Sequence, residues 1–277
     1  MLIVRSPLLP VIIVALFALF ASAALADDFT PPCTKPFLPG KAVAIDSRCG
    51  TKGTGGDEAD QNEAKNNFCA KGPLMALTFD RLGTLQADVV KNKKINFGDL
   101  GNHGAHGPTK DRAPLRTLGE GKRVQLKGFV LIARQEKGES VNCGHDFDHE
   151  PEKNPFHDIH ISLVGTKELA SSTDETQKDA IECQSVVAEM TPHFRPSGWT
   201  AGGVNKVAKK HLLVRVTGHL FFDSSHVPCA SGKPVRSNPK RFSLWEIHPI
   251  YKFEVCIADC DAEGTWQTLG QWLTNNP

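Results

Sequence analysis

The sequence predicts a mainly β protein with a small helical part, whose core is a five-stranded barrel like that of the oligonucleotide/oligosaccharide-binding (OB) fold. Five segments of β character occur between residues 122 and 255, and the first of them is long and contains Gly128. A break separates the third segment from the last two. A β-sandwich needs about seven strands, and the sequence does not supply the extra two. Another small barrel is the alternative.

The chain divides into four parts by composition. We expect a signal peptide, an irregular and helical extension tethered by disulfides, an OB-like β-barrel, and a C-terminal helix or tail. Their boundaries are residues 1–26, 27–115, 116–260 and 261–277.

The first 26 residues have the three parts of a secretory signal peptide. Arg5 precedes an apolar run over residues 8–19, and an Ala-Leu-Ala26 end follows. The alternative is an uncleaved anchor, but a bilayer span needs about 20 apolar residues and Pro10 interrupts this run. We therefore expect a secreted or periplasmic protein that begins at Asp27 and has no transmembrane segment after cleavage.

The extension reads as a Pro- and Gly-rich arm over residues 27–56, followed by two helices over 57–70 and 78–91. In the second helix Leu82, Leu85 and Val89 share one face.

The barrel strands are expected at 122–134, 157–164, 185–191, 211–222 and 245–255. A glycine at position 128 suits a bend that lets the first strand serve both halves of the barrel. Pro249 predicts a bulge or an unpaired stretch in the fifth strand, and a C-terminal helix is expected near 266–273.

The cysteine content indicates a disulfide-bonded protein. The eight cysteines all follow the signal peptide, and an even number in an exported chain favours disulfides over a metal site, with the pairing left open. They are Cys33, Cys49, Cys69, Cys143, Cys183, Cys229, Cys256 and Cys260.

The charge of the chain is balanced. Lys and Arg total 32 against 31 Asp and Glu, and cleavage removes Arg5. The mature chain thus has no net charge with which to attract a polyanion.

Alternation in the strands defines a candidate ligand face. If Ile159, Ile161 and Leu163 fill the barrel, Asp158 and His160 point outward, on the face where OB folds bind ligands. The candidate residues of that face are Asp158, His160, Glu189, Arg215, His226, Glu246 and His248.

The chemistry of these side chains suits a divalent metal such as zinc. Asp158, His160 and His248 are the candidate metal ligands. In an OB barrel the third strand separates the second from the fifth, so His248 has to reach across it near Glu189. The alternative is an ordinary polar face in contact with solvent, because no His-Glu-x-x-His motif is present. No cofactor other than such a metal is indicated, since the chain lacks nucleotide-binding glycine motifs and a nucleophile elbow.

Three segments resemble a group of uncharacterised bacterial exported proteins with an OB-like core. They are Val214-Arg-Val-Thr-Gly-His219, Phe222-Asp-Ser-Ser-His226 and Ser243-Leu-Trp-Glu-Ile-His-Pro249. The resemblance covers about residues 120–256 and implies the fold and the exported setting. It carries over no catalytic residue.

These observations predict a secreted or periplasmic binding or structural module of unknown ligand. The alternative is a metal-dependent hydrolase, a nuclease or phosphoesterase, that uses the outward His and Asp residues. A non-specific oligonucleotide binder is a third hypothesis, which strong salt dependence of binding would identify. The sequence indicates no particular partner and no oligomeric state.

Overall fold

A computed structural model describes residues 50–54, 56–69, 71–98, 112–143, 156–174, 176–229, 239–261 and 263–277. The predicted signal peptide and most of the Pro- and Gly-rich arm lie outside these residues. So do the glycine-rich stretch at 99–111 and the acidic stretch at 144–155.

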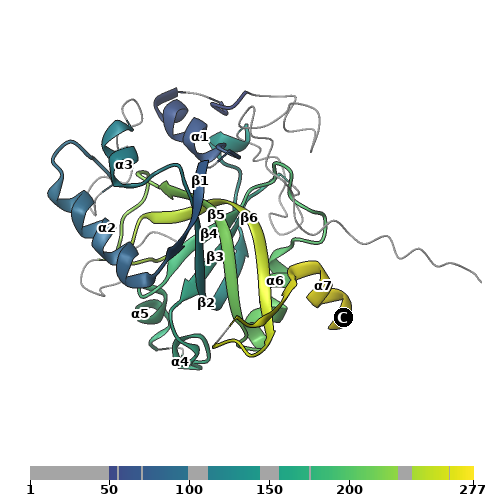
Figure 1. Cartoon of the computed structure of the whole chain (residues 1–277). Coiled ribbons are helices and arrows are strands. Elements are labelled where there is room, and N and C mark those ends of the chain that lie inside the picture. The colour runs from purple at the N-terminus through teal and green to yellow at the C-terminus, as the bar shows by residue number, and fades with distance from the viewer. Residues whose placement is uncertain are drawn as a thin grey trace, which may run out of the picture.

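Five strands close into a barrel, which confirms the predicted fold (Figure 1). The order is β2-β3-β4-β6-β5, and β5 pairs back onto β2. Only the β4–β6 pair within this ring is parallel. The barrel strands are β2 (Lys122–Gln135), β3 (Ile159–Val164), β4 (Val186–Met190), β5 (Leu213–Phe222) and β6 (Trp245–Ala258).

The long first strand serves both halves of the barrel, as predicted. Its first half pairs with β5 up to Phe129, and from Phe129 onward it pairs with β3. A Cβ atom added at Gly128 would lie 3.0 Å from the main-chain oxygen of Val164 and 3.1 Å from the ring of Phe79. The glycine is therefore required by close approach where the strand changes partners.

The bulge predicted from Pro249 is present. The β5–β6 register passes from Gly218 opposite Ile250 to Leu220 opposite Ile247, so His248 and Pro249 have no paired residue in the register with β5. A Cβ at Gly218 would come within 2.4 Å of the main-chain oxygen of Pro249. The bulge includes His248, one of the candidate metal ligands.

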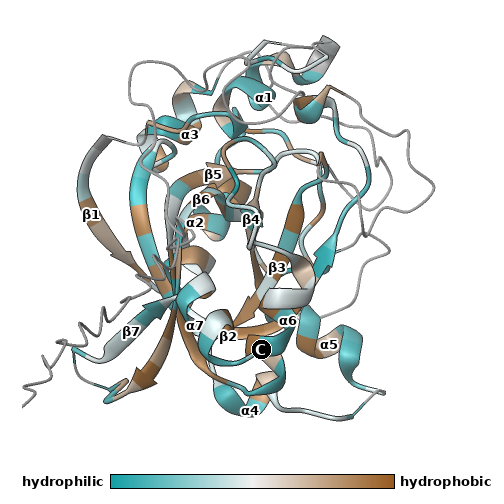
Figure 2. Cartoon of the chain, turned by 90° about the vertical axis from the view of Figure 1, so that its right-hand side faces the viewer, coloured by the Kyte–Doolittle hydropathy of each residue, from teal (hydrophilic) through white to brown (hydrophobic). Residues whose placement is uncertain are grey.

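Two further strands and several helices surround the barrel. Strand β1 (Lys71–Leu77) lies parallel to β2, and β7 (Thr265–Thr268) pairs with β6. The helices are η2 (Gly56–Glu58), α1 (Ala59–Lys65), α2 (Phe79–Lys91), α3 (Ala113–Leu118), η3 (Ser140–Asn142), α4 (Lys167–Ala170), α5 (Lys178–Glu182), α6 (Ala201–Lys209) and α7 (Leu269–Asn275). Helices α1 and α3 lie at one end of the barrel and α4 at the other (Figures 1 and 2). No helix within the described ranges combines the length and apolarity that a bilayer span requires.

Strand β1 and helix α6 are among the elements that were not expected from the sequence. Strand β1 contains Gly72 and Pro73 and lacks a clean alternation, so its pattern resembles a loop. Helix α6 falls where a loop was expected, because Gly202 and Gly203 lower its intrinsic helical propensity. It forms because Thr200 caps its N-terminus and because it buries apolar side chains against the barrel.

The core lies inside the barrel and follows the predicted alternation. Ile159, Ile161 and Leu163 of β3 all belong to it, together with the apolar residues of the other strands. Brown, apolar segments are accordingly concentrated along the barrel strands in Figure 2. However, every residue of β3 and β4 is buried, including those that point outward. The alternative of an ordinary polar face in contact with solvent is therefore wrong for these two strands.

Disulfides join Cys183 to Cys229 and Cys256 to Cys260. Cys143 is disulfide-bonded as well. The first bridge ties the turn before β4 to the segment after β5, and the second closes a short loop at the end of β6.

Candidate metal centre

The outer face of three adjacent strands presents an imidazole, a carboxylate and an imidazole in a row. His160 on β3 stands directly opposite Glu189 on β4. On the other side of β4, Ala188 pairs with Ile247 of β6 in parallel, which places His248 next to Glu189. Strand β4 lies between the two histidines but does not keep them apart, because its Glu189 carboxylate lies between the two imidazole rings.

Distances within this row are those of direct contact. The Nε2 atom of His160 lies 3.1 Å from Oε1 of Glu189, and Nδ1 of His248 lies 2.6 Å from Oε2 of the same carboxylate. Each oxygen of Glu189 thus faces a different histidine.

A second carboxylate joins the row from the residue that precedes β3. Asp158 is fully buried, and neither of its carboxylate oxygens has a hydrogen-bond partner among the described residues. One oxygen of Asp158, one of Glu189 and a ring nitrogen of His248 all lie within 4.8 Å of one another. A buried carboxylate without a partner is costly unless a proton or a cation compensates it.

The outer face is covered by the N-terminal extension and by the segment after β2. The Nζ atom of Lys65, at the end of α1, lies 2.9 Å from Oε2 of Glu139. The other oxygen of Glu139 lies 3.5 Å from Nε2 of His160, and Glu136 lies 3.4 Å from Nδ1 of that ring. This cover explains the burial of the row: His160 is 4% exposed, Glu189 1% and His248 0%.

A second buried polar network adjoins the first. The guanidinium of Arg241 bonds Glu246, which precedes His248 by two positions on the same face of β6. The same guanidinium lies 3.4 Å from Oδ2 of Asp223, and His226 contacts that oxygen too. The predicted residue Glu246 therefore links the two networks, since its Oε2 atom lies 4.0 Å from Nδ1 of His248, whereas His226 contacts only the second network through Asp223.

Burial and neighbouring charges shift the pKa values of Asp158, Glu189 and His160, and for Glu189 and His160 the two effects oppose each other. Burial raises the pKa of Asp158, and the nearby Glu139 adds to that effect. Burial alone would also raise the pKa of Glu189, but His160 and His248 outweigh it and hold that pKa well below its usual range. Burial opposes the charged form of His160, yet Glu189 and Glu139 raise the pKa of that ring. The protonated form of His160 and the ammonium of Lys65 therefore supply positive charge beside Glu189 and Glu139.

The donor atoms are spaced as metal ligands are. Zinc–ligand bonds of about 2.0–2.2 Å in a tetrahedron place neighbouring donor atoms roughly 3.3–3.6 Å apart. The contacts of 3.1 Å and 3.5 Å at Nε2 of His160 fall close to that range. Two triads each bring one donor atom per residue within 4.8 Å of the others: Glu139, His160 and Glu189, and Asp158, Glu189 and His248. The second would need small side-chain movements, because its 2.6 Å contact is shorter than ligands around one ion allow.

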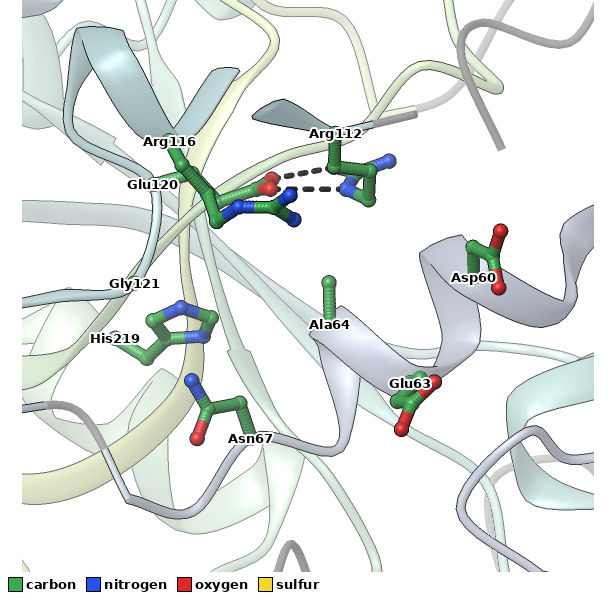
Figure 3. A pocket seen from close by; sticks show the side chains of 9 residues that line it. All are labelled: Asp60, Glu63, Ala64, Asn67, Arg112, Arg116, Glu120, Gly121 and His219. Carbon is green, nitrogen blue, oxygen red and sulfur yellow. Dashed lines mark hydrogen bonds and ion pairs between the residues drawn. The ribbon is translucent and has the colours of Figure 1, made fainter. Parts of the chain in front are cut away.

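A pocket of about 410 Å³ is lined in part by His219 of β5, which contacts the main chain of His248 (Figure 3). The Nδ1 atom of His219 donates a hydrogen bond of 2.9 Å to the main-chain oxygen of His248, since a carbonyl can only accept. Burial lowers the pKa of His219 to about 3, so the ring is neutral and Nε2 is an acceptor. That acceptor has no hydrogen-bond partner in the described part of the chain.

The structure therefore brings together most, but not all, of the predicted ligand face. Asp158, His160, Glu189 and His248 converge, whereas Arg215 lies elsewhere, bound to Glu254 and stacked on Trp266. Sequence reasoning missed Glu139 and Lys65, which come from segments outside the barrel strands. It also missed His219, although its position on the strand paired with β6 was a usable signal.

Comparison of the chain with protein-family models, with curated proteins and with solved structures returned no match.

Proposed function

We propose that this protein is an exported metal-binding module, in which the outer face of an OB-like barrel holds a divalent transition-metal ion of the zinc class. One observation carries the proposal: Asp158 is fully buried beside a His–Glu–His row, and both its oxygens lack a hydrogen-bond partner among the described residues. An ion in this position would compensate the buried carboxylates and accept lone pairs from the imidazoles.

The donor set favours zinc-like ions over magnesium or calcium. Imidazole nitrogen suits zinc, copper and nickel, whereas magnesium and calcium prefer sites built from oxygen alone. Metal-bound histidines commonly bond a carboxylate through the second ring nitrogen. Glu136, 3.4 Å from Nδ1 of His160, is placed for that role.

An exported setting is part of the proposal. The bridges Cys183–Cys229 and Cys256–Cys260 form and persist in oxidising compartments. They support the secreted or periplasmic location expected from the N-terminal sequence.

The test is calorimetric titration of the chelator-treated protein with zinc. We expect binding that is micromolar or tighter, and a loss of affinity of about 100-fold or more in Glu189→Gln, since loss of second-shell groups already costs 10–100-fold. The matched control is Glu254→Gln, the same substitution on β6 at a residue paired with Arg215 outside the cluster. Absence of zinc binding in the wild type, or equal loss in both variants, would refute the proposal.

A metal-dependent hydrolase, such as a nuclease or phosphoesterase, is the second candidate. It is favoured by the pocket that His219 lines, where the exposed side chain of Arg116 could bind a phosphate ester and Nε2 of His219 could accept a hydrogen bond from an attacking water. Bound zinc would lower the pKa of a coordinated water toward 7. Hydrolysis of bis(p-nitrophenyl) phosphate by the zinc-loaded wild type, lost in His219→Gln with zinc affinity retained, would support the enzyme. If the zinc-loaded protein hydrolyses the substrate no faster than the zinc-free protein, the enzyme hypothesis is wrong and the metal-binding module remains.

A further inference from the structure

We propose that the cluster binds two divalent ions rather than one, bridged by the carboxylate of Glu189. This inference rests on the proposed metal-binding function and deepens it. It assigns Glu139 and His160 to one ion, and Asp158 and His248 to the other.

The two triads share only Glu189. Each consists of one imidazole, one carboxylate of its own and one oxygen of the shared carboxylate. On the first side Oε1 of Glu189 faces His160, and on the second side Oε2 faces His248. A carboxylate whose oxygens face two different sets of ligands is the arrangement that bridges ions about 3.5–4 Å apart in two-metal sites.

Strand geometry explains why one ion does not serve both sides. Neighbouring strands lie about 4.8 Å apart, so the β3 and β6 backbones that bear the histidines are separated by roughly twice that distance, with β4 between them. The ring of His160 contacts Glu139 and Glu136 on its own side of Glu189. The ring of His248 lies on the opposite side, within reach of Asp158.

The charge of the site calls for at least one divalent ion and is compatible with two. Six carboxylates belong to the row and the adjoining network: Glu136, Glu139, Asp158, Glu189, Asp223 and Glu246. The side chains of Lys65, Arg195 and Arg241 are the cations that face them. With neutral histidines the excess of negative charge is three, so one divalent ion leaves one negative charge and two ions leave one positive charge. Buried charge without compensation is strongly unfavourable.

The experiment measures the zinc content of the full mature chain after loading and gel filtration, by elemental analysis against protein concentration. We expect two ions per chain in the wild type. Glu139→Gln and Asp158→Asn should each retain one ion, because each removes a carboxylate that belongs to one triad only. The control Glu254→Gln should retain two.

The outcomes separate this inference from the function on which it rests. No zinc in the wild type overturns both. One ion in the wild type leaves the metal-binding function in place and overturns the pair. Two ions that Glu139→Gln and Asp158→Asn leave unchanged overturn the assigned ligands.

A measurement on the wild type covers the case in which the variants fold poorly. Two cobalt(II) ions bridged by one carboxylate are magnetically coupled, whereas separate sites are not. We expect the electron paramagnetic resonance signal per cobalt to fall as the second equivalent binds. A signal that grows in proportion to cobalt through two equivalents would overturn the bridge.

Discussion

Glu189 stands directly opposite His160 across the β3–β4 ladder, with its Oε1 atom 3.1 Å from Nε2 of the imidazole. This pair lies on the outer face of a barrel whose interior is apolar, and the N-terminal extension covers it. The protein thus has an apolar core inside the barrel and a polar cluster outside it, both buried. The following predictions address each part.

Zinc should stabilise the folded chain, because an ion that binds only the native state adds free energy of unfolding by mass action. At a free zinc concentration 100 times the dissociation constant the gain is about 2.7 kcal/mol per site. Thermal unfolding with and without zinc measures it, with magnesium at the same concentration as the control. Equal melting temperatures in zinc and in chelator would contradict the prediction.

The two faces of β3 should respond differently to truncation. Ile161→Ala removes a fully buried side chain from the barrel interior and should cost about 2–5 kcal/mol. Ser162→Ala, on the covered outer face, removes a weak contact to Glu182 and should cost about 0.5–1.5 kcal/mol. Urea denaturation compares the two. A silent Ser162→Ala would show that the outer face is less tightly covered than the structure indicates.

Loss of Arg241 should be among the most destabilising single changes. Its guanidinium is fully buried between Glu246 and Asp223, and Arg241→Met leaves both carboxylates without it. Removal of one partner of a buried pair costs about 3–5 kcal/mol. Arg215→Met, at a partly exposed pair with Glu254, is the control and should cost less than about 1 kcal/mol. Similar values for both variants would argue against burial of the Arg241 network.

Acid should weaken the fold through Asp223. Burial alone would raise the pKa of this carboxyl, but His226, Lys65 and Arg241 outweigh it and hold the pKa far below the usual 3.8. A group with a depressed folded pKa contributes stability above its unfolded pKa and loses it as pH falls toward the folded value. The stability difference between wild type and Asp223→Asn should therefore be constant from pH 7 to about pH 5 and shrink below about pH 4. Urea titrations across this range measure it, and a difference that already shrinks near pH 6 would indicate another group.

The two disulfides should differ in their contribution to stability. Their cysteines are separated by 46 residues in one bridge and by 4 in the other. Loop-closure entropy then predicts a loss of about 4 kcal/mol for the Cys183→Ala/Cys229→Ala variant and about 2 kcal/mol for Cys256→Ala/Cys260→Ala. Denaturation under non-reducing conditions compares them. A larger loss from the short bridge would mean that strand pairing between β6 and β7 depends on it.

The barrel and the faces of its strands were predictable from the sequence, because alternation has a period of two and follows from local backbone geometry. The inward set Ile159, Ile161 and Leu163, the bend at Gly128 and the bulge at Pro249 each depend on a few neighbouring residues. Only the tertiary structure decided what lies over the outer face. Lys65 and Glu139 reach His160 from segments far from it in the chain, so no local pattern could show that the face is buried. The placement of Glu189 between His160 and His248 likewise depended on strand order, which long-range pairing determines.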